Sequence, residues 1–401
     1  MSAMLHCDYL VIGGGLGGLT AANVLAEAGC DVVLVDRSLP EARGALGGFT
    51  RFSGAKFSLL PAGQGLAPVA GGLGALRATT QDVLAFCDLA DHSAVGSLDL
   101  LDDQPIGAQA SMRAYQSIVL TPQQVERLVE RISGKVGASI RVIDAGIDEL
   151  RPGPSGWLAF SRGGAIVEGR VAIFCGGRMG GTLLRRAGAM PQEGKGIDLG
   201  VRIEFAERES LRALRDRGPD AKILIGPTRT FCLNSPGTIF RYGFRQITIP
   251  GGIVADTSER GANFGILTRV QGKEDRLGRV LRALRTVPPA EYEAAPTVKG
   301  APFQDKTAIL ESAYGFEVVG HLKKFAETLG ELGLVDWTSE HRIHFPLLDW
   351  HWDTFAVGHS HRTSQPNLFV AGDAAGHARG LLQAGVSGWL AAREALADAS
   401  L

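Results

Sequence analysis

The chain has 401 residues, a formal net charge of −1 at pH 7 and 21% charged residues. This near-neutral balance argues against nucleic acid as a main partner. No uncharged apolar run is long enough to cross a bilayer, and no signal peptide precedes the first apolar run. The five cysteines are dispersed without a CxxC pair, which is typical of a reducing compartment. We therefore expect a soluble cytoplasmic protein, without stable membrane insertion, whose length allows two domains.

The first glycine motif lies close to the N-terminus, at residues 13–18, and it follows an apolar run at 9–12. A helix-forming stretch at 19–26 comes next, and a second apolar run at 32–35 leads directly to Asp36. The order strand, glycine turn, helix, strand and acid is that of a dinucleotide-binding unit.

Each glycine of this motif has a distinct expected task. Gly13 makes the tight turn, Gly15 lets the backbone approach a pyrophosphate, and Gly18 lets the helix pack on the strand. The pyrophosphate would lie at the helix N-terminus, and Asp36 would hold ribose hydroxyls. A tight turn without a ligand is the alternative. The cofactor-binding residues expected in this region are Gly13, Gly15, Leu16, Gly17, Gly18, Asp36 and Arg37.

A glycine-rich stretch with little periodicity follows, from residue 42 to residue 74, and such long loops are usually functional or disordered. Within it, residues 45–57 resemble the segment that passes beside the flavin in fumarate-reductase-like flavoproteins. This resemblance implies cofactor contacts from Gly47 and Gly48. Lys56 is a catalytic candidate as a proton relay near flavin N5. Neutralising a phosphate, or solvation on a loop, are its alternatives.

The next elements are expected to extend the nucleotide fold. A helix is expected over 121–132, because a threonine N-cap, a proline and a capping-box glutamine begin it. Alternating strands are expected at 139–144 and 157–160, and a buried strand at 171–174. The cofactor-binding candidate Gly176 follows that strand, where flavin hydroxylases place an aspartate.

The middle of the chain differs in composition and is the candidate substrate region. Charged helices are expected at 207–217 and 273–285, and an aromatic-rich strand at 238–244. Arg241 and Tyr242 on that strand are predicted to bind an anionic or planar substrate. An ordinary half-exposed sheet is the alternative for this pattern.

Six of the nine histidines lie between His341 and His377. No cysteine or Glu-x-x-His partner accompanies them, so no metal site is expected. His344, His351 and Trp352 are further substrate-pocket candidates, because they lie shortly before the C-terminal motif. A packed, half-buried strand is the alternative for the Trp-His-Trp run.

A second glycine motif lies near the C-terminus, where an apolar run at 367–371 leads into Gly372 and Asp373, before a helix from about Gly380 to Ala397. With this motif the chain resembles the glutathione-reductase-like FAD superfamily. The nearest resemblance is to a bacterial group of FAD-dependent dehydrogenases of largely unassigned substrate. That group carries a serine-aspartate-glycine-lysine sequence where this chain has residues 53–56 as Ser-Gly-Ala-Lys, so the aspartate is missing here. The superfamily implies FAD as the dinucleotide, bound here by Gly372, Asp373, Gly380, Leu381 and Leu382.

The start of this last helix is also the expected catalytic region. A helix N-terminus stabilises negative charge, which reduction of a flavin places on its pyrimidine edge. His377 and Arg379 flank this position and are predicted to add positive charge there. Phosphate or backbone contacts without a redox role are the alternative.

These elements together predict an α/β fold. A Rossmann-type FAD-binding domain is built from discontinuous segments, because the two glycine motifs lie at opposite ends of the chain. An α+β substrate domain is inserted into it. The expected FAD-binding segments are 1–75, 119–202 and 355–401, and the expected substrate segments are 76–118 and 203–354.

The predicted function is that of an FAD-dependent dehydrogenase or reductase. It would transfer a hydride between a small organic substrate and flavin N5, with transient NAD(P)H or another electron donor or acceptor completing the cycle. The first alternative is an FAD-dependent monooxygenase, which the glycine at position 176 disfavours. The second is a redox-neutral protein in which FAD is structural. Neither the substrate nor the oligomeric state follows from these patterns.

Overall fold

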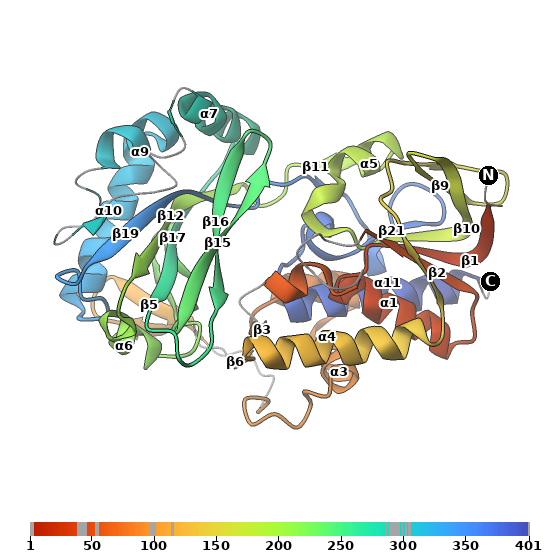
Figure 1. Ribbon diagram of the computed structural model, residues 1–401, viewed down its shortest axis with the longest axis horizontal. Helices are drawn as coiled ribbons and strands as arrows, with labels where there is room; N and C mark the ends of the chain where they lie inside the picture. The colour runs from red at the N-terminus through yellow and green to blue at the C-terminus, as the bar shows by residue number, and fades with distance from the viewer. Residues whose placement is uncertain are drawn as a thin grey trace. The chain divides into compact units, whose positions relative to one another are not determined.

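The computed structural model describes residues 4–37, 46–52, 56–96, 102–113, 116–285, 287–288, 297–298, 300, 303 and 306–399. The chain divides into two compact units (Figure 1). Unit 1 comprises Met1–Asp99, Gln123–Gly194 and Trp352–Leu401, and unit 2 comprises Leu100–Pro122 and Lys195–His351.

A parallel sheet forms the centre of unit 1, with β21 beside β10 and the order β7-β2-β1-β10 continuing from it. Its strands are β1 (Leu5–Ile12), β2 (Val32–Asp36), β7 (Arg141–Asp144), β10 (Gly164–Phe174) and β21 (Leu368–Val370). Continuous apolar runs form the inner strands because both faces of a parallel sheet are covered. The mixed α/β fold with a Rossmann-type sheet is thus confirmed.

Helices α1 (Leu16–Glu27) and α11 (Leu381–Ala399) pack closely against each other in unit 1. The Thr20 hydroxyl donates to the Gly385 carbonyl at 2.9 Å. A Cβ at Gly388 would lie 1.9 Å from the Gly17 carbonyl oxygen, so only glycine permits this approach. Helices α1 and α11, from opposite ends of the chain, therefore form one helical layer against the parallel sheet.

The predicted helix after residue 121 is confirmed as α4 (Pro122–Gly137), whose apolar side is buried. The remaining elements of unit 1 are small: η1 (Gly48–Phe52), β3 (Lys56–Ser58), η2 (Gln64–Leu66), α2 (Ala67–Ala70), α3 (Leu73–Phe86), β8 (Glu149–Pro152), β9 (Trp157–Ser161), η3 (Gly177–Gly180), α5 (Gly181–Arg186), β11 (Pro191–Gln192), β20 (Thr354–Phe355), η6 (His359–His361) and η7 (Gly372–Ala375).

The unit boundaries differ from the expected segments at four places. Two are short: residues 119–122 lie in unit 2, and residues 352–354 lie in unit 1. The other two are longer. Residues 76–99 lie in unit 1 because α3 packs on α11. Residues 195–202 lie in unit 2 because their strand pairs with two strands of that unit. Neither pairing is visible in local sequence, because the partners lie far along the chain.

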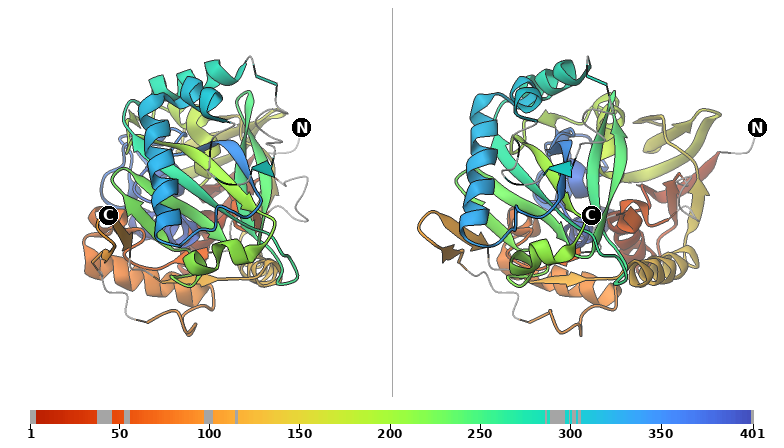
Figure 2. Two further views of the ribbon diagram at one scale, coloured as in Figure 1. Left: turned by 90° about the vertical axis from the view of Figure 1, so that its left-hand side faces the viewer. Right: turned by 60° about the vertical axis from the view of Figure 1, so that its left-hand side comes forward.

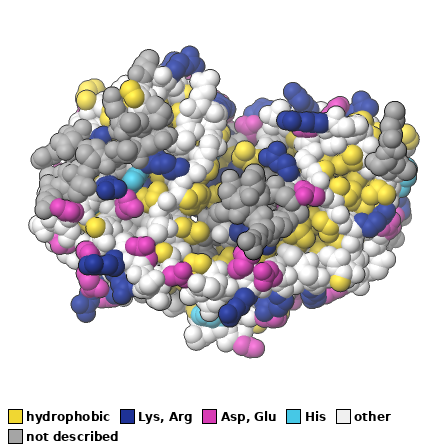
Figure 3. All heavy atoms as spheres, in the orientation of Figure 1, with side chains coloured by type: hydrophobic (Ala, Val, Ile, Leu, Met, Phe, Trp, Pro, Cys, Tyr) yellow, Lys and Arg dark blue, Asp and Glu magenta, His cyan; other side chains and the backbone are white. Residues whose placement is uncertain are grey.

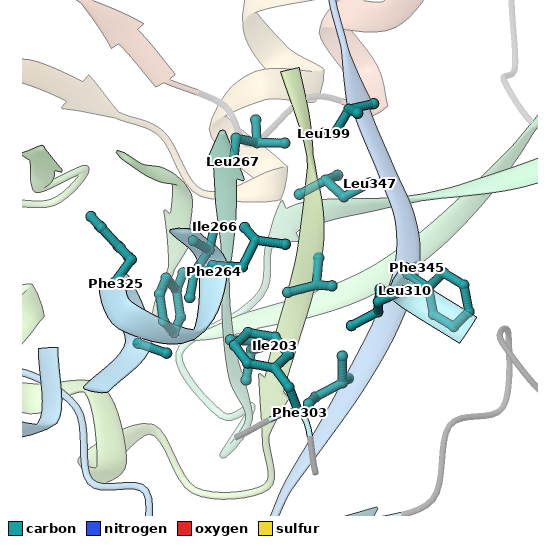
Figure 4. Packing of buried hydrophobic residues seen from close by; sticks show 14 of the residues in the cluster. Leu199, Ile203, Phe264, Ile266, Leu267, Phe303, Leu310, Phe325, Phe345 and Leu347 are labelled. Atoms are coloured by element: carbon teal, nitrogen blue, oxygen red, sulfur yellow. The ribbon is translucent and has the colours of Figure 1, made fainter. Parts of the chain in front are cut away.

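Unit 2 is built on an antiparallel sheet with the order β18-β19-β12-β17-β14-β13-β5-β4. Its strands are β4 (Gln104–Ile106), β5 (Ala110–Arg113), β12 (Ile197–Phe205), β13 (Lys222–Ile225), β14 (Thr228–Asn234), β17 (Ala262–Val270), β18 (Thr297–Val298) and β19 (His341–Asp349). Figure 4 shows its core, which includes Leu199 and Ile203 of β12 together with Phe264, Phe325 and Phe345.

The two faces of this sheet are covered differently (Figures 1 and 2). Helices pack on the apolar face, namely α7 (Lys273–Arg285), α9 (Thr307–Tyr314) and α10 (Phe316–Glu331). The hairpin of β15 (Gly237–Phe244) and β16 (Ile247–Val254) covers the other face, so polar residues of the sheet are enclosed between two β layers.

Two local predictions are corrected. The region 207–217 is not one helix but a short η4 (Arg208–Leu211) followed by α6 (Arg212–Arg215). The run from Trp350 to Trp352 is no strand, because β19 ends at Asp349 and Trp350 adopts a φ of +58°. The expected strand at 238–244 is confirmed as β15, and the helix 273–285 as α7.

Charged side chains of both signs are interspersed on the face in Figure 3, in keeping with the net charge of −1. None of the helices in the described part of the chain has both the length and the apolar character of a bilayer-spanning helix.

Candidate functional site: a dinucleotide cradle and a polar layer

The turn between β1 and α1 has the geometry of a dinucleotide cradle. Gly13 has a φ of +104°, and a Cβ there would lie 2.6 Å from the Cys175 carbonyl oxygen. A Cβ at Gly18 would lie only 1.8 Å from the Gly13 carbonyl oxygen. A Cβ at Gly15 would meet none of the described atoms within 4 Å. Two of the glycines are therefore required by packing, whereas Gly15 leaves space at the surface of the turn.

That space lies at the N-terminus of α1. Gly15 is the N-cap residue and supplies no side-chain hydrogen bond to the helix. The first N–H groups of a helix and its dipole favour an anion, so a pyrophosphate fits this position. The described residues of this turn therefore fit a dinucleotide, since none of their atoms lies within 4 Å of a Cβ at Gly15.

Asp36 ends β2 beside this turn. Burial raises the pKa of its carboxyl group, and hydrogen bonds from the backbone of Gly14 and Arg37 oppose that rise. The Arg37 N–H donates to the carboxylate at 2.9 Å, while the Arg37 side chain is exposed. The acid is thus fixed to the glycine turn, as a ribose-binding acid would have to be.

The Gly47–Gly48 turn packs on the same glycine loop. The Gly47 N–H donates to the Gly14 carbonyl at 2.8 Å, and Gly47 forms a parallel bridge with Gly15. A Cβ at Gly48 would lie 3.2 Å from the Gly15 Cα. Segments separated in sequence therefore combine at one edge of the sheet. Residues 53–55 of the predicted loop lie outside the described residues.

The C-terminal motif reaches this edge because β21 pairs with β10. Gly372 follows with a φ of +72°, and its N–H donates to the Ser387 hydroxyl at 2.7 Å. The Ser387 hydroxyl lies 3.0 Å from Nε2 of His361. The hydroxyl therefore links the Gly372 backbone to the His361 ring through two hydrogen bonds, and the direction of the second depends on the histidine tautomer.

His361 is fully buried, and this burial lowers its pKa to about 3, with a smaller contribution from His377. The two imidazole rings meet edge to face, with centroids 5.9 Å apart. The predicted catalytic residue His377 thus lies over a buried neutral histidine that orients the Gly372 turn.

Asp373 is held by two side chains of unit 1. Nε of Arg178 donates to its carboxylate at 2.8 Å, and the Trp352 indole donates to its carbonyl at 2.9 Å. The Arg178 guanidinium stacks on Trp352, 4.2 Å from the ring centroid, and lies 5.8 Å from that of Phe49. Trp352 therefore supports the cofactor motif, whereas we predicted it in a substrate pocket.

Gln383 joins the start of α11 to the segment after β3. Its side-chain amide donates to the carbonyls of Ser58 at 2.8 Å and Ala62 at 3.1 Å. Lys56 lies at the beginning of that strand, and Arg379 lies two residues before the first residue of α11; both are half-buried. Catalytic roles for Lys56, His377 and Arg379 stay predictions.

The polar layer of unit 2 follows from the alternation of β12. Its odd-numbered residues are apolar and face the core, whereas the opposite face carries Asp198, Arg202 and Glu204. His344 of β19 pairs in register with Arg202. Because the β15–β16 hairpin covers this face, the polar side chains are enclosed rather than fully solvated.

Arg241, His344 and Glu204 form a hydrogen-bonded chain in this layer. Nη2 of Arg241 lies 2.8 Å from Nδ1 of His344, whose Nε2 lies 3.0 Å from Glu204. A guanidinium can only donate, so Nδ1 accepts and Nε2 carries the proton given to the carboxylate. The hydrogen bond from His344 lowers the pKa of Glu204. The chain fixes both the tautomer of the imidazole and the direction of the arginine.

The strand that carries Arg241 also carries two aromatic residues, whose rings contact His351. The His351 ring meets the Phe244 ring at a centroid distance of 4.4 Å and the Tyr242 ring at 6.5 Å. Together with Arg241, they combine a positive charge with flat apolar surface. Among the described residues, no three histidine, cysteine or acidic side chains are grouped as a metal site requires.

The structure therefore brings the predicted cofactor-binding residues together in unit 1 and most predicted substrate residues together in unit 2. The first group is Gly13, Gly15, Leu16, Gly17, Gly18, Asp36, Arg37, Gly47, Gly48, Gly176, Gly372, Asp373, Gly380, Leu381 and Leu382; the second is Arg241, Tyr242, His344 and His351. Our sequence reasoning missed Arg178, Glu204, His361, Gln383 and Ser387 as site residues. Only Glu204 had a usable signal, the alternation of β12.

Residues 8–190 match the protein family described as FAD dependent oxidoreductase, or DAO. The matched range contains the β1–α1 turn, Asp36 and the Gly47–Gly48 turn. The protein is an FAD-dependent oxidoreductase. FAD is the dinucleotide that the unit 1 cradle fits. The finer resemblance to the glutathione-reductase-like superfamily and its bacterial dehydrogenase group stays a prediction.

No curated protein matches the chain. Among solved structures, it is similar to a flavoprotein/dehydrogenase from Cytophaga hutchinsonii, with 13% identity and a TM-score of 0.46 over 98% of this chain and 79% of that one. It is also similar to a glycine oxidase from Geobacillus kaustophilus, with 13% identity and a TM-score of 0.45 over 98% and 95%. A third similar structure is an anhydrotetracycline hydroxylase from Streptomyces rimosus, with 15% identity and a TM-score of 0.43. The comparison covers 98% of this chain and 63% of the hydroxylase chain. Likenesses at these scores carry no argument about the reaction.

Proposed function

We propose that this FAD-dependent oxidoreductase is a dehydrogenase or reductase that transfers a hydride between a small organic substrate and flavin N5. Bound FAD would supply the hydride acceptor or donor and carry negative charge on its pyrimidine edge when reduced. Unit 1 would hold the cofactor at the carboxyl edge of its parallel sheet. Transient NAD(P)H or another donor or acceptor would complete the cycle.

The observation that carries the proposal is the Arg241–His344–Glu204 chain. Arg241 keeps its charge at any physiological pH, and the chain holds its guanidinium in one direction. Such a group binds an anionic or carbonyl oxygen of a substrate. The adjoining rings of Tyr242 and Phe244 suit a planar body. We therefore propose a small, planar or anionic compound as the substrate class.

The packing around Gly176 favours this reaction over the monooxygenase alternative. A Cβ at Gly176 would lie 2.6 Å from the Phe174 ring, and a Cβ at Gly180 only 1.8 Å from it. The ring fills the space that an aspartate side chain would need. The acid that flavin hydroxylases carry here is absent, and the local packing is built for small residues.

The direct test is anaerobic reduction of the FAD-loaded protein by NADH, NADPH and candidate organic reductants. The loss of visible flavin absorbance measures the reduction. Arg241→Gln should raise KM or Kd for an effective substrate by roughly 10-fold or more, because a hydrogen bond to a charged group contributes about 1.5–3 kcal/mol. The exposed Arg245→Gln is the matched control and should have little effect.

Two outcomes would contradict the proposal. Oxygen from labelled dioxygen incorporated into product, in a fixed ratio to NADPH consumed, would support the monooxygenase. FAD that no organic donor or acceptor reduces or reoxidises, although dithionite reduces it, would support the redox-neutral alternative.

Arg379→Ala should lower the midpoint potential of bound FAD. An arginine beside the N-terminus of α11 cannot lose its proton, so it would stabilise the charge of the reduced cofactor. A contact of about 1–2 kcal/mol corresponds to roughly 20–45 mV for a two-electron couple. Dye-equilibration titration measures the shift. The midpoint potential of Arg379→Lys should lie between those of the wild type and Arg379→Ala. The exposed Arg393→Ala on helix α11 should leave the potential unchanged. An unchanged potential with FAD still bound to Arg379→Ala would exclude this role.

A further inference from the structure

The β15–β16 hairpin carries Arg241, yet it forms a two-stranded sheet of its own. Among the described strands, β15 and β16 pair only with each other. At the base of the hairpin the Gly237 N–H donates to the carbonyl of Gly261, the residue before β17, at 2.9 Å. Beyond this base, side-chain contacts determine how the hairpin lies on the polar layer, and with it the position of Arg241.

Asn263 of β17 provides such a contact. Its side chain is fully buried, and its Nδ2 donates to the Thr238 carbonyl of β15 at 3.1 Å. Thr238 lies on the same strand as Arg241 and precedes it by one turn of the side-chain alternation. Within the large sheet, Asn263 lies opposite Glu204, the carboxylate that accepts from His344. Two sets of hydrogen bonds therefore join the hairpin to neighbouring positions of the sheet.

Two further side chains fix the orientation of the Asn263 amide. Nη1 of Arg202 donates to Oδ1 of Asn263 at 2.7 Å, and Nδ2 of Asn234 donates to the same oxygen at 3.0 Å. Since a guanidinium can only donate, the atom that faces Arg202 is the amide oxygen. The amide nitrogen therefore faces Thr238. Arg202, Asn234 and Asn263 form what we term the Asn263 node, and each is at most 1% exposed.

Strand β16 places a glycine on this node. A Cβ at Gly252 would lie 2.3 Å from Nη1 of Arg202 and 2.3 Å from Oδ1 of Asn263. It would lie 2.4 Å from Nδ2 of Asn234. These three atoms are hydrogen-bonded to one another, so none can move aside without weakening the node. The hairpin thus lies directly on the node, at a distance that only a glycine permits.

We propose that the Asn263 node holds the β15–β16 hairpin in place and thereby positions Arg241 for the substrate. This inference rests on the proposed function, in which Arg241 binds the substrate. The residues of the node are positioning residues: they hold the hairpin at Thr238 and Gly252, and Arg241 then lies within hydrogen-bond distance of His344. The predicted cofactor-binding residues lie in unit 1, so FAD binding should not depend on the node.

Asn263→Asp separates positioning from a purely structural role. The carboxylate would accept from Arg202 and Asn234 as the amide oxygen does. It would also give Arg202 a counterion, since this buried guanidinium forms no ion pair with a carboxylate in the described part of the chain. An ionised aspartate has no N–H for the Thr238 carbonyl and repels that oxygen. The variant should therefore keep or raise the wild-type Tm while it loses the contact with the hairpin.

The first measurement is hydrogen–deuterium exchange of the FAD-loaded protein, followed by peptide mass spectrometry. In Asn263→Asp, peptides within residues 237–254 should exchange roughly 5- to 10-fold faster than in the wild type, because the net loss of one hydrogen bond changes a local opening equilibrium by about that factor. Gly252→Ala should accelerate exchange of the same peptides, because its methyl group pushes the hairpin off the node.

Two variants are controls for the exchange measurement. Gly243→Ala lies in the same hairpin, and a Cβ there meets none of the described atoms within 4 Å, so exchange should stay as in the wild type. Thr230→Val removes a buried hydroxyl of β14 that bonds to the backbone of Ala221 and Ile223 and not to the hairpin. It should lower the Tm without accelerating exchange of the hairpin.

The second measurement is calorimetric titration with 2-naphthoate, a planar anion of the proposed substrate class. Asn263→Asp should raise its Kd by roughly 5-fold or more, and Arg241→Gln by roughly 10-fold or more. The double variant should bind no more weakly than Arg241→Gln alone, because the node acts through Arg241. FAD content should be the same in all of these proteins.

Unchanged hairpin exchange in both Asn263→Asp and Gly252→Ala overturns the proposal. So does an unchanged Kd of Asn263→Asp where Arg241→Gln weakens binding, or additive effects in the double variant. An unchanged Kd of Arg241→Gln instead contradicts the substrate-binding role in the proposed function, while exchange still decides whether the node holds the hairpin. If the wild type does not bind 2-naphthoate, hairpin exchange alone decides.

Discussion

Gly15→Val is expected to abolish FAD binding while leaving the apoprotein folded. The backbone at Gly15 has φ −70° and ψ −178°, which a valine adopts without strain, and a Cβ there meets no atom of the described residues within 4 Å. The new side chain would instead fill the space at the α1 N-terminus that a pyrophosphate needs. We expect FAD affinity to fall at least about 100-fold, which corresponds to roughly 3 kcal/mol. Released flavin is measured by chromatography after denaturation, and the wild type should yield FAD rather than FMN.

The controls separate loss of the ligand from loss of the fold. Gly134→Val adds a side chain into open space on an exposed part of α4 and should keep full FAD content. Gly18→Ala places its Cβ 1.8 Å from the Gly13 carbonyl oxygen, so it should destabilise the apoprotein itself by about 1–3 kcal/mol or more. If Gly15→Val binds FAD normally, or lowers the apoprotein Tm as much as Gly18→Ala does, Gly15 does not serve cofactor approach.

Local sequence patterns correctly predicted the helices and strands whose conformation depends on residues close together in the chain. The strand, glycine turn, helix and acid of residues 9–36 follow each other directly, so a continuous stretch contains the whole unit. The same holds for the C-terminal strand and helix, which the structure places at 368–370 and 381–399. The charged segment 207–217 was wrongly predicted to be one helix. Charge and helix propensity do not show where tertiary packing makes a helix end.

The residues that the sequence did not reveal depend on contacts between distant strands. Arg178 lies 195 residues from its partner Asp373, and His344 lies 140 residues from Glu204. A single sequence does not show which residues of two distant strands lie opposite each other. The buried polar face of β12 could have been found, since its strict alternation predicts one polar face. That the face is enclosed by a hairpin required the structure.

The largest expected effect of pH on stability comes from His361. Its pKa is about 3 in the folded protein, against 6.5 for an ordinary histidine, because it is fully buried. Between these values the unfolded chain binds a proton that the folded chain does not. Stability is therefore fully present above the ordinary value and is lost as the pH falls towards 3. The loss should be about 2 kcal/mol between pH 6.5 and roughly pH 4.5. Urea unfolding at a series of pH values measures it.

His361→Asn should flatten this dependence by the contribution of one proton. Asparagine is among the residues that tolerate the φ of +69° found at His361. The variant should be less stable at neutral pH because it leaves unfilled space, so the slope is the informative quantity and not the midpoint. The exposed neighbour His359→Asn should keep the wild-type slope.

FAD release provides a second readout, because the hydroxyl of Ser387 links His361 to the Gly372 turn. Protonation of His361 would place a buried charge beside the hydroxyl that holds the Gly372 turn, so the wild type should release FAD over the same pH range in which it loses stability. An identical slope in wild type and His361→Asn would show that His361 titrates alike in the folded and unfolded chains and has no part in holding the turn.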